Sequence, residues 1–292
     1  MNAEGALLLS GRVSRLRRAK NTAFTASMGL CVVLALTPLM LIVSYVVVKG
    51  WSALSVNLFT REPAGPLSPA SGGIVQSFIG SLLIVGVAVL LAVPLGILTA
   101  VYLSEFGRGR MGGIVRFVAE VLLSTPSIIA GAFVWALVVT RMGTFSAIAG
   151  SIALTVLMWP IIARAGEEVL RLVPDELREG GLALGLPRWK VISRVVLPTA
   201  GAGLTTAVMV AVARGIGETA PILLTALGNE YINLDPRQPT DAVPLRVYAY
   251  ARTPIEALHS IAWGGAITLL VAVLGLSIAT RILSARQLKR LA

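Results

Sequence analysis

One arginine and one glutamate, Arg214 and Glu218, stand inside a long apolar run, ARGIGETAPILLTA, at residues 213–226. A guanidinium group offers a planar fork of N–H donors that suits oxyanions, and it stays charged at physiological pH. On a helix the two residues share one face, although Arg before Glu is the less favourable order for an ion pair. Two interpretations stay open: a structural ion pair, or an anion path that Arg214, Glu218 and Thr219 line.

Hydroxyl groups cluster around a proline in a second apolar stretch, LLSTPSIIAG, at residues 122–131. The proline frees backbone carbonyls, which together with the hydroxyls could line a cavity, and a simple proline kink fits equally well. The candidates are Ser124, Thr125, Pro126 and Ser127. Arg116 and Glu120, four residues apart near the start of this stretch, predict a structural ion pair.

The composition is that of a membrane protein. Hydrophobic residues fill 56% of the 292 positions and charged residues 13%, whereas soluble domains carry about a quarter charged residues. The mean hydropathy is +0.84. Intervals without any charged residue approach or exceed the roughly 20 residues that a helix needs to cross a bilayer. We therefore predict an all-α integral membrane protein with six transmembrane helices, near residues 23–48, 76–103, 114–139, 143–163, 199–226 and 257–282.

The basic residues predict the orientation of the chain. With the N-terminus inside, segments 1–22, 104–116, 164–197 and 281–292 are cytoplasmic and hold 18 of the 25 Lys and Arg residues. Because basic residues favour the cytoplasmic side, both termini are predicted to be cytoplasmic. The net charge of +11 then fits contact of the basic tail 1–22 with anionic lipid. No motif indicates nucleic-acid binding. Residues 23–292 form one transmembrane domain, with outside loops at 49–75 and 227–256.

Residue types that support enzymatic or metal chemistry are scarce. The only cysteine is Cys31 and the only histidine is His259, so no disulfide or thiol metal site is expected. None of the four lysines follows a glycine, which excludes a Walker A phosphate loop. No span carries a Ser/His, paired-carboxylate or metal-spaced cluster. We therefore expect no catalytic residue, cofactor or metal in this chain.

The cytoplasmic segment 164–197 has the pattern of two short helices. Pro174 suits the first position of a helix, and the acidic residues that follow it suit the positive end of the helix dipole. Gly185 is placed to end that helix in a left-handed conformation, and Pro187 begins a second helix that Pro198 ends. The pattern predicts a docking element, although an ordinary amphipathic connector fits the periodicity as well.

This segment resembles the signature of ABC importer permeases, which is Glu-Ala-Ala, three residues, Gly, nine residues, then Ile-x-Leu-Pro. Two glycines replace the alanines here, and each weakens a helix by roughly 1 kcal/mol relative to alanine. In that family the element is a coupling helix that sits in a cleft of a cytoplasmic ATPase subunit, so the resemblance implies this role for residues 174–197. A valine also stands in place of the isoleucine. The residues at the signature positions are Glu179, Gly180, Gly181, Gly185, Val195, Leu197 and Pro198.

Three further stretches are similar to permeases of phosphate importers: RGIGETAP (214–221), LLSTPSIIAG (122–131) and GGIVQSFIGSLLIV (72–85). The residues after Gly217 lean toward the PstA branch rather than the related PstC branch. The resemblance implies a non-catalytic subunit in a bacterial inner or plasma membrane. The partners it implies are an ABC ATPase dimer that holds ATP and magnesium, a second permease subunit and an extracytoplasmic phosphate-binding protein.

Two other transporter classes stay open. A sulfate or molybdate importer permease would share the coupling segment but lack the RGIGETAP stretch. An ion-coupled secondary transporter would need no ATPase, although such proteins commonly use more spans.

Overall fold

The computed structural model describes residues 15–64 and 71–291, and these ranges are mostly helical. The chain forms two compact units, residues 1–48 and 49–292. The described part of the first unit belongs to α2 (Arg15–Trp51), which contains Pro38. The most apolar window of α2 has no residue buried within the protein, as expected for a helix that meets lipid. Of the predicted tail 1–22, residues 1–14 lie outside the described ranges, and the rest already belongs to α2.

The second unit contains the remaining helices and two π-helical turns. They are α3 (Val56–Thr60), α4 (Val75–Glu105), α5 (Arg110–Ser124), α6 (Ser127–Val134), η2 (Trp135–Val139), α7 (Thr140–Met142), α8 (Ala147–Arg171), α9 (Asp175–Ala183), α10 (Arg188–Val191), η3 (Ile192–Val196), α11 (Leu197–Thr199), α12 (Gly201–Gly217), α13 (Ala220–Thr225), α14 (Val243–Ala251) and α15 (Glu256–Leu291). The predicted outside loop 227–256 contains turns and the helix α14, and loop 49–75 contains α3.

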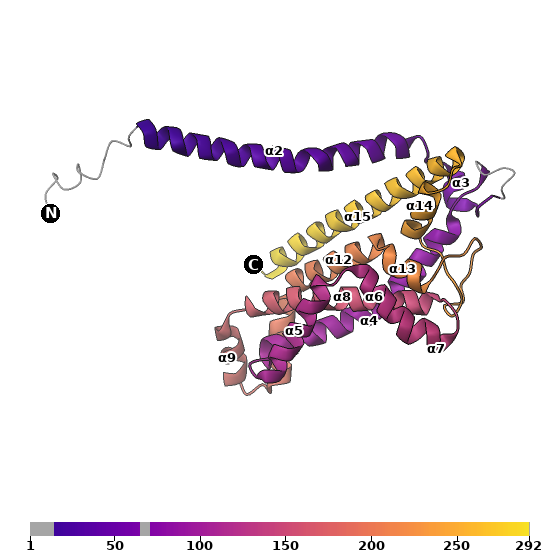
Figure 1. Ribbon diagram of the computed structural model, residues 1–292. Helices are drawn as coiled ribbons and strands as arrows, with labels where there is room; N and C mark the ends of the chain where they lie inside the picture. The colour runs from indigo at the N-terminus through magenta and orange to yellow at the C-terminus, as the bar shows by residue number, and fades with distance from the viewer. Residues whose placement is uncertain (1–14, 65–70, 292) are drawn as a thin grey trace. The chain divides into compact units, whose positions relative to one another are not determined.

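The helices α4 and α8 pack along each other at the centre of this unit (Figure 1). Small residues allow the close approach: a Cβ added to Gly96 would lie 2.6 Å from Ile162, and one added to Gly166 would lie 2.8 Å from Ala100. Around this pair, α12 packs on α8, and α15 packs on both α12 and α14. Small residues at helix contacts are typical of membrane proteins.

Within the described ranges, four helices are long and apolar enough to cross a membrane: Arg17–Trp51, Val75–Glu105, Ala147–Arg171 and Glu256–Ile282. Two further candidates are bent pairs, Arg110–Ser124 with Ser127–Met142 at 108° and Arg188–Thr199 with Gly201–Gly217 at 72°. The six-span count stays a prediction, because it requires each bent pair to form one span. The third predicted span is thus bent at residues 124–127, and the fifth, predicted near 199–226, is interrupted between Gly217 and Ala220.

The helices differ in extent from the predicted spans. The fourth span was predicted near residues 143–163, and the helix at that place, α8, runs from Ala147 to Arg171. Its last turns contain Glu167, which is buried with arginine partners. Pro198 does not end the second short helix, since α11 runs on to Thr199. The fifth span breaks after Gly217, where Glu218 adopts an extended backbone before α13.

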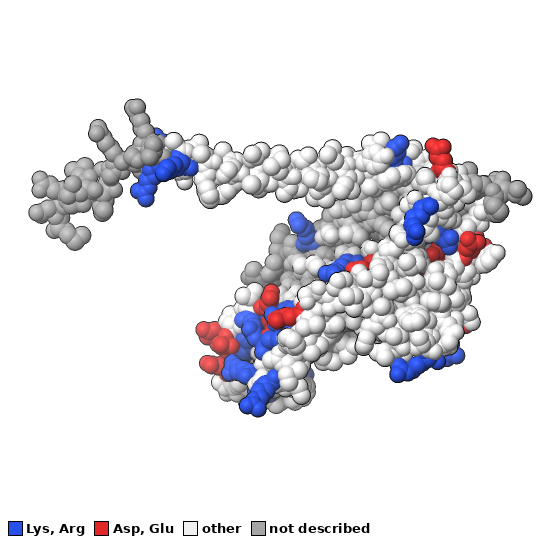
Figure 2. All heavy atoms as spheres, viewed as in Figure 1, with Lys and Arg blue, Asp and Glu red and all other residues white. Residues whose placement is uncertain are grey.

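Charged residues gather at the end of the second unit that carries α5 and α9, while the middle of the same face is almost entirely uncharged (Figure 2). This distribution is the one that a bilayer imposes, because charged side chains in the hydrocarbon core are costly.

Candidate functional site

The predicted pair of Arg214 and Glu218 is present at the broken end of α12. Arg214 Nε lies 3.4 Å from Glu218 Oε1, and the two side chains are 49% and 15% exposed. Glu218 is the first residue beyond the helix, with φ −72° and ψ 129°. Thr219 follows in the same break, and its carbonyl accepts a hydrogen bond from Leu223 N. The guanidinium therefore stands at a helix break with only one of its nitrogens bonded to the carboxylate.

The broken segments of the third and fifth predicted spans pack against each other. A Cβ added to Gly131 of α6 would lie 2.6 Å from Pro221 Cα of α13. Each segment follows a break, at residues 124–127 and at residues 217–220. Discontinuous helices of this kind supply substrate sites in other transporters, because a break frees backbone groups near the membrane centre.

The predicted cavity-lining residues lie at the first of these breaks. Ser124 and Thr125 both donate their hydroxyl hydrogens to Val121 O, at 2.9 and 2.7 Å. Pro126 precedes α6, and Ser127 is the first residue of that helix. The 108° bend is far sharper than a simple proline kink. While these two bonds are kept, the hydroxyl groups of Ser124 and Thr125 have no hydrogen left to donate. They can then act only as hydrogen-bond acceptors toward a group in the path.

Residues 174–197, the predicted coupling segment, form the two predicted short helices. Gly185 ends α9 with φ +77°, the left-handed conformation that its position predicts. Gly181 is buried against Val191, where an added Cβ would lie 3.0 Å from that side chain, whereas Gly180 has open space around it. Glu179 is exposed. Val195 and Leu197 pack on an apolar cluster that includes Val191, Val196 and Leu204, and Pro198 is exposed.

The surface of this segment carries large apolar side chains that sequence reasoning did not assign. Leu172 is 81% exposed, Leu184 is 83% exposed and Trp189 is 64% exposed. On a segment predicted to lie in water rather than lipid, exposed apolar groups of this size mark a protein contact. Leu184, directly before Gly185, was the signal for this contact surface in the sequence, because the end of a helix does not require a leucine at that position.

Arg178 was also missed, and it ties α9 to two long helices. Its Nε lies 3.1 Å from Glu105 Oε1 at the end of α4. Its two terminal nitrogens donate to Val173 O and Leu170 O at the end of α8, the latter at 2.8 Å. A lysine could not replace this fork, because its donors share one nitrogen.

The predicted pair of Arg116 with Glu120 is wrong. Arg116 Nε instead contacts Glu167 Oε1 at 2.7 Å, and Glu120 pairs with Arg164 at 3.1 Å. Glu167 is 1% exposed and also accepts from Arg164 and Arg171. Because a buried carboxylate needs several donors, Glu167 gathers two arginines from its own helix α8 and draws Arg116 of α5 away from Glu120.

A second buried charge cluster joins the predicted outside loop to α4. Asp241 Oδ2 accepts from Ser77 Oγ at 2.5 Å and from Arg246 Nε at 2.7 Å. Arg246 also donates to Asn229 O at 2.7 Å. Burial raises the pKa of Asp241 above its usual value, and the charge of Arg246 offsets part of that rise. The cluster borders a cavity of about 540 Å³ that Arg246, Arg252 and Asn229 help to line.

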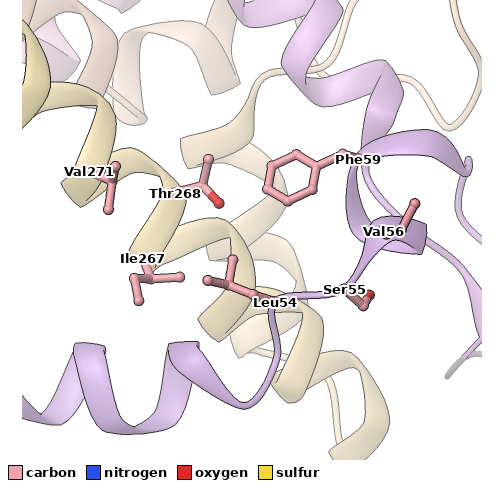
Figure 3. Close-up of a pocket in the computed structure, with 7 residues that line it drawn as sticks. All are labelled: Leu54, Ser55, Val56, Phe59, Ile267, Thr268 and Val271. Atoms are coloured by element: carbon pink, nitrogen blue, oxygen red, sulfur yellow. The ribbon is translucent and has the colours of Figure 1, made fainter.

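Another pocket, of about 410 Å³, lies between α3 and α15 and has a different character (Figure 3). Figure 3 shows Phe59 pointing from α3 toward Thr268 of α15. The polar groups of its lining are the hydroxyls of Ser55 and Thr268. Without a charged donor this pocket does not suit an anion. His259, on the same helix α15, contacts the backbone oxygen of Thr253 at 2.7 Å, as expected for a structural side chain.

Residues 92–289 match the family of binding-protein-dependent transport system inner membrane components. The phosphate transport system permease protein PstA 1 of Mycobacterium tuberculosis (strain CDC 1551 / Oshkosh) is 42% identical over 267 residues, which cover 90% of this chain and 88% of the relative. The PstA protein of Haemophilus influenzae is 39% identical over 91% of this chain and 94% of its own length.

Solved structures show the same fold. The inward-facing MetNI methionine ABC transporter superposes with a TM-score of 0.58 at 19% identity, covering 73% of this chain and 93% of that chain. A bacterial ABC transporter that imports the acidic polysaccharide alginate gives 0.57 at 16% identity, covering 94% and 99%. The architecture is that of a type I ABC importer permease. With the family match and the two relatives, these likenesses show that the chain belongs to the PstA branch of the binding-protein-dependent transport permeases.

Proposed function

We propose that this chain is the permease subunit of an ATP-driven importer of inorganic phosphate and forms half of its translocation path. The relatives named as phosphate permeases support the substrate, at about 40% identity over most of the chain. The observation that carries the proposal is Arg214, a half-exposed guanidinium at a helix break in an otherwise apolar segment. Such a charge is costly in a membrane and is retained where it has a function.

The remaining subunits follow from the family. A PstB-like ATPase dimer binds ATP and magnesium and docks on α9, a PstC-like permease completes the path, and a PstS-like protein delivers phosphate from outside. The chain itself is non-catalytic and needs no cofactor. The exposed apolar side chains beside Gly185 support the docking role, and the cavity at Arg246 and Arg252 supports delivery at loop 227–256.

Uptake of labelled phosphate by cells that lack other phosphate transporters tests the substrate path. Arg214→Glu is expected to reduce uptake at least tenfold, because it replaces the guanidinium donors by a carboxylate, which is negatively charged like phosphate. Arg214→Lys keeps the positive charge and is expected to retain part of the uptake. Arg141→Glu is the matched control, since that exposed arginine donates only to Leu137 O one turn back. Uptake by Arg214→Glu at the wild-type rate would refute the role of Arg214, and labelled sulfate taken up in place of phosphate would refute the substrate.

A further inference from the structure

A polar cavity of about 470 Å³ lies at the foot of α9, away from the predicted path. The ends of α4 and α8, the start of α5 and the two short helices α9 and α10 enclose it. Its lining contains five arginines and two carboxylates, which leaves an excess of positive charge. The charged residues are Arg108, Arg116, Arg171, Arg178, Arg188, Glu105 and Asp175.

The carboxylates at this cavity already have partners. Glu105 and Asp175 both contact Arg178, each at 3.1 Å. Behind the lining, Glu167 takes up Arg116 at 2.7 Å and Arg171 at 2.6 Å. These pairs fix the cavity walls and use every acidic group of the lining, so none is left to balance the other guanidinium groups.

Three guanidinium groups keep unused donors. Arg108 has an exposed side chain with no hydrogen bond or ion pair in the described ranges. Arg188 donates to Glu105 O at 2.6 Å and lies over the Phe106 ring at 4.5 Å. Arg171 contacts Glu167 through one terminal nitrogen. Because each guanidinium carries five N–H donors, most of the donors of these three groups are free.

The cavity and the docking surface lie on different sides of α9. Arg178 and Asp175 face the cavity, whereas Gly180 lies about 200° around the helix from Arg178, at 100° per residue. A partner that contacts Gly180 therefore lies on the opposite side of α9 from the part of this helix that lines the cavity. The cavity instead adjoins the ends of α4 and α8, which the sequence predicts to lie on the cytoplasmic side of the membrane.

We propose that this arginine-lined cavity binds a phosphate group from the cytoplasmic side, carried by an anionic lipid headgroup or as free orthophosphate. A phosphate group has several acceptor oxygens, so it can take bonds from more than one guanidinium fork at once. Basic pockets between transmembrane helices on this side are known to suit lipid headgroups. The proposal does not depend on which solute the protein transports.

A phosphate group bound in this cavity would connect the α4–α5 turn, the end of α8 and the start of α10, which the protein's own ion pairs connect only in part. Arg108 lies in the turn between α4 and α5, Arg171 ends α8, and Arg188 begins α10. A phosphate group shared by these three side chains fixes the short coupling helices to the long ones. The occupied protein is therefore expected to unfold at a higher temperature than the empty one.

The experiment uses the full chain purified with its ATPase and permease partners, in an Arg214→Gln background that removes anion binding at the predicted path. Arg108→Gln is the test variant, because the Arg108 side chain is exposed and makes no hydrogen bond or ion pair with any described residue. Arg110→Gln is the matched control, an exposed arginine two residues away that does not line the cavity. Arg108→Lys asks whether charge alone is enough.

Two arms separate the sources of the phosphate group. In the lipid arm, nanodiscs of phosphatidylcholine with phosphatidylglycerol are dissolved in detergent, and native mass spectrometry measures the anionic lipid that stays bound. In the free-ion arm, phosphatidylcholine nanodiscs are titrated with inorganic phosphate, with chloride as reference, and the melting temperature is followed. Arg108→Gln is expected to lose the signal several-fold in one arm, while Arg110→Gln keeps it and Arg108→Lys keeps part.

The arm that responds identifies the source. Equal signals from the wild-type side chain and Arg108→Gln in both arms would overturn the proposal. It would also be overturned if Arg108→Gln lost the ATPase with both arms unchanged, since an acidic surface of that partner would then fill the cavity. Neither arm measures transport. A variant that fails in the phosphate-uptake assay would contradict the proposed function without affecting the result on this cavity.

Discussion

Arg178 joins the coupling helix to α4 and α8 through a single guanidinium group. Substitution by lysine keeps the charge but cannot reach Glu105 and the carbonyls of Leu170 and Val173 together. We expect Arg178→Lys to retain the ATPase and its ATP hydrolysis but to lower phosphate transported per ATP several-fold in proteoliposomes. Arg110→Lys, whose side chain is exposed, is the control. An unchanged ratio in Arg178→Lys would show that α9 transmits force without this contact.

Asp241 and Arg246 form the buried pair that holds the outside loop on α4. Breaking a buried pair on one side costs on the order of 3–5 kcal/mol, because the remaining charge stays buried. Asp241→Asn is therefore expected to lower the melting temperature in detergent by several degrees. Replacing both residues, in Asp241→Asn with Arg246→Gln, is expected to restore part of the loss. A double variant as unstable as the sum of the single variants would show that the two side chains are not coupled.

At the scale of elements, two adjacent glycines in α9 have opposite surroundings. Gly180 has open space, whereas a Cβ at Gly181 would lie 3.0 Å from Val191. Gly180→Ala is expected to stabilise α9 by roughly 1 kcal/mol and to leave ATPase recovery unchanged. Gly181→Leu must push α9 and α10 apart and is expected to reduce recovery of the ATPase in affinity purification. Equal recovery with both variants would mean that the spacing of these helices does not matter for docking.

The sequence predicted those elements whose causes are local. Gly185 ends α9 as expected because a left-handed residue is a requirement of that one turn. The intervals without charge located the long apolar helices for a similar reason. Arg116 and Glu120 were wrongly paired with each other because the partner of each, Glu167 and Arg164, lies on another helix. The break at Glu218 was missed as well, although Pro221 near the start of α13 was a signal for it.

For the whole molecule, the bias of basic residues predicts that both termini and segment 164–197 are cytoplasmic. In a Cys31→Ser background, the chain has no other cysteine, so single cysteines report the topology. A cysteine at exposed Arg237 is expected to react with a membrane-impermeant maleimide in intact cells, whereas one at exposed Ser193 reacts only after lysis. Labelling of Ser193→Cys in intact cells would reverse the orientation and move the proposed ATPase dock outside.

The close packing of α4 against α8 has a mechanical consequence. At Gly96 and Gly166 the two backbones lie so close that a shift of one helix along the other would make side chains overlap with backbone. We therefore expect α4 and α8 to move as one rigid body. Arg178 binds Glu105 at one end of α4, and Ser77 near the other end of α4 donates a hydrogen bond to Asp241. The 31 residues of α4 span about 45 Å at 1.5 Å per residue. We therefore expect a displacement of α9 to reach the predicted outside loop through α4 and α8 together, with the bends at residues 124–127 and at Ala200 as the points about which the neighbouring segments turn.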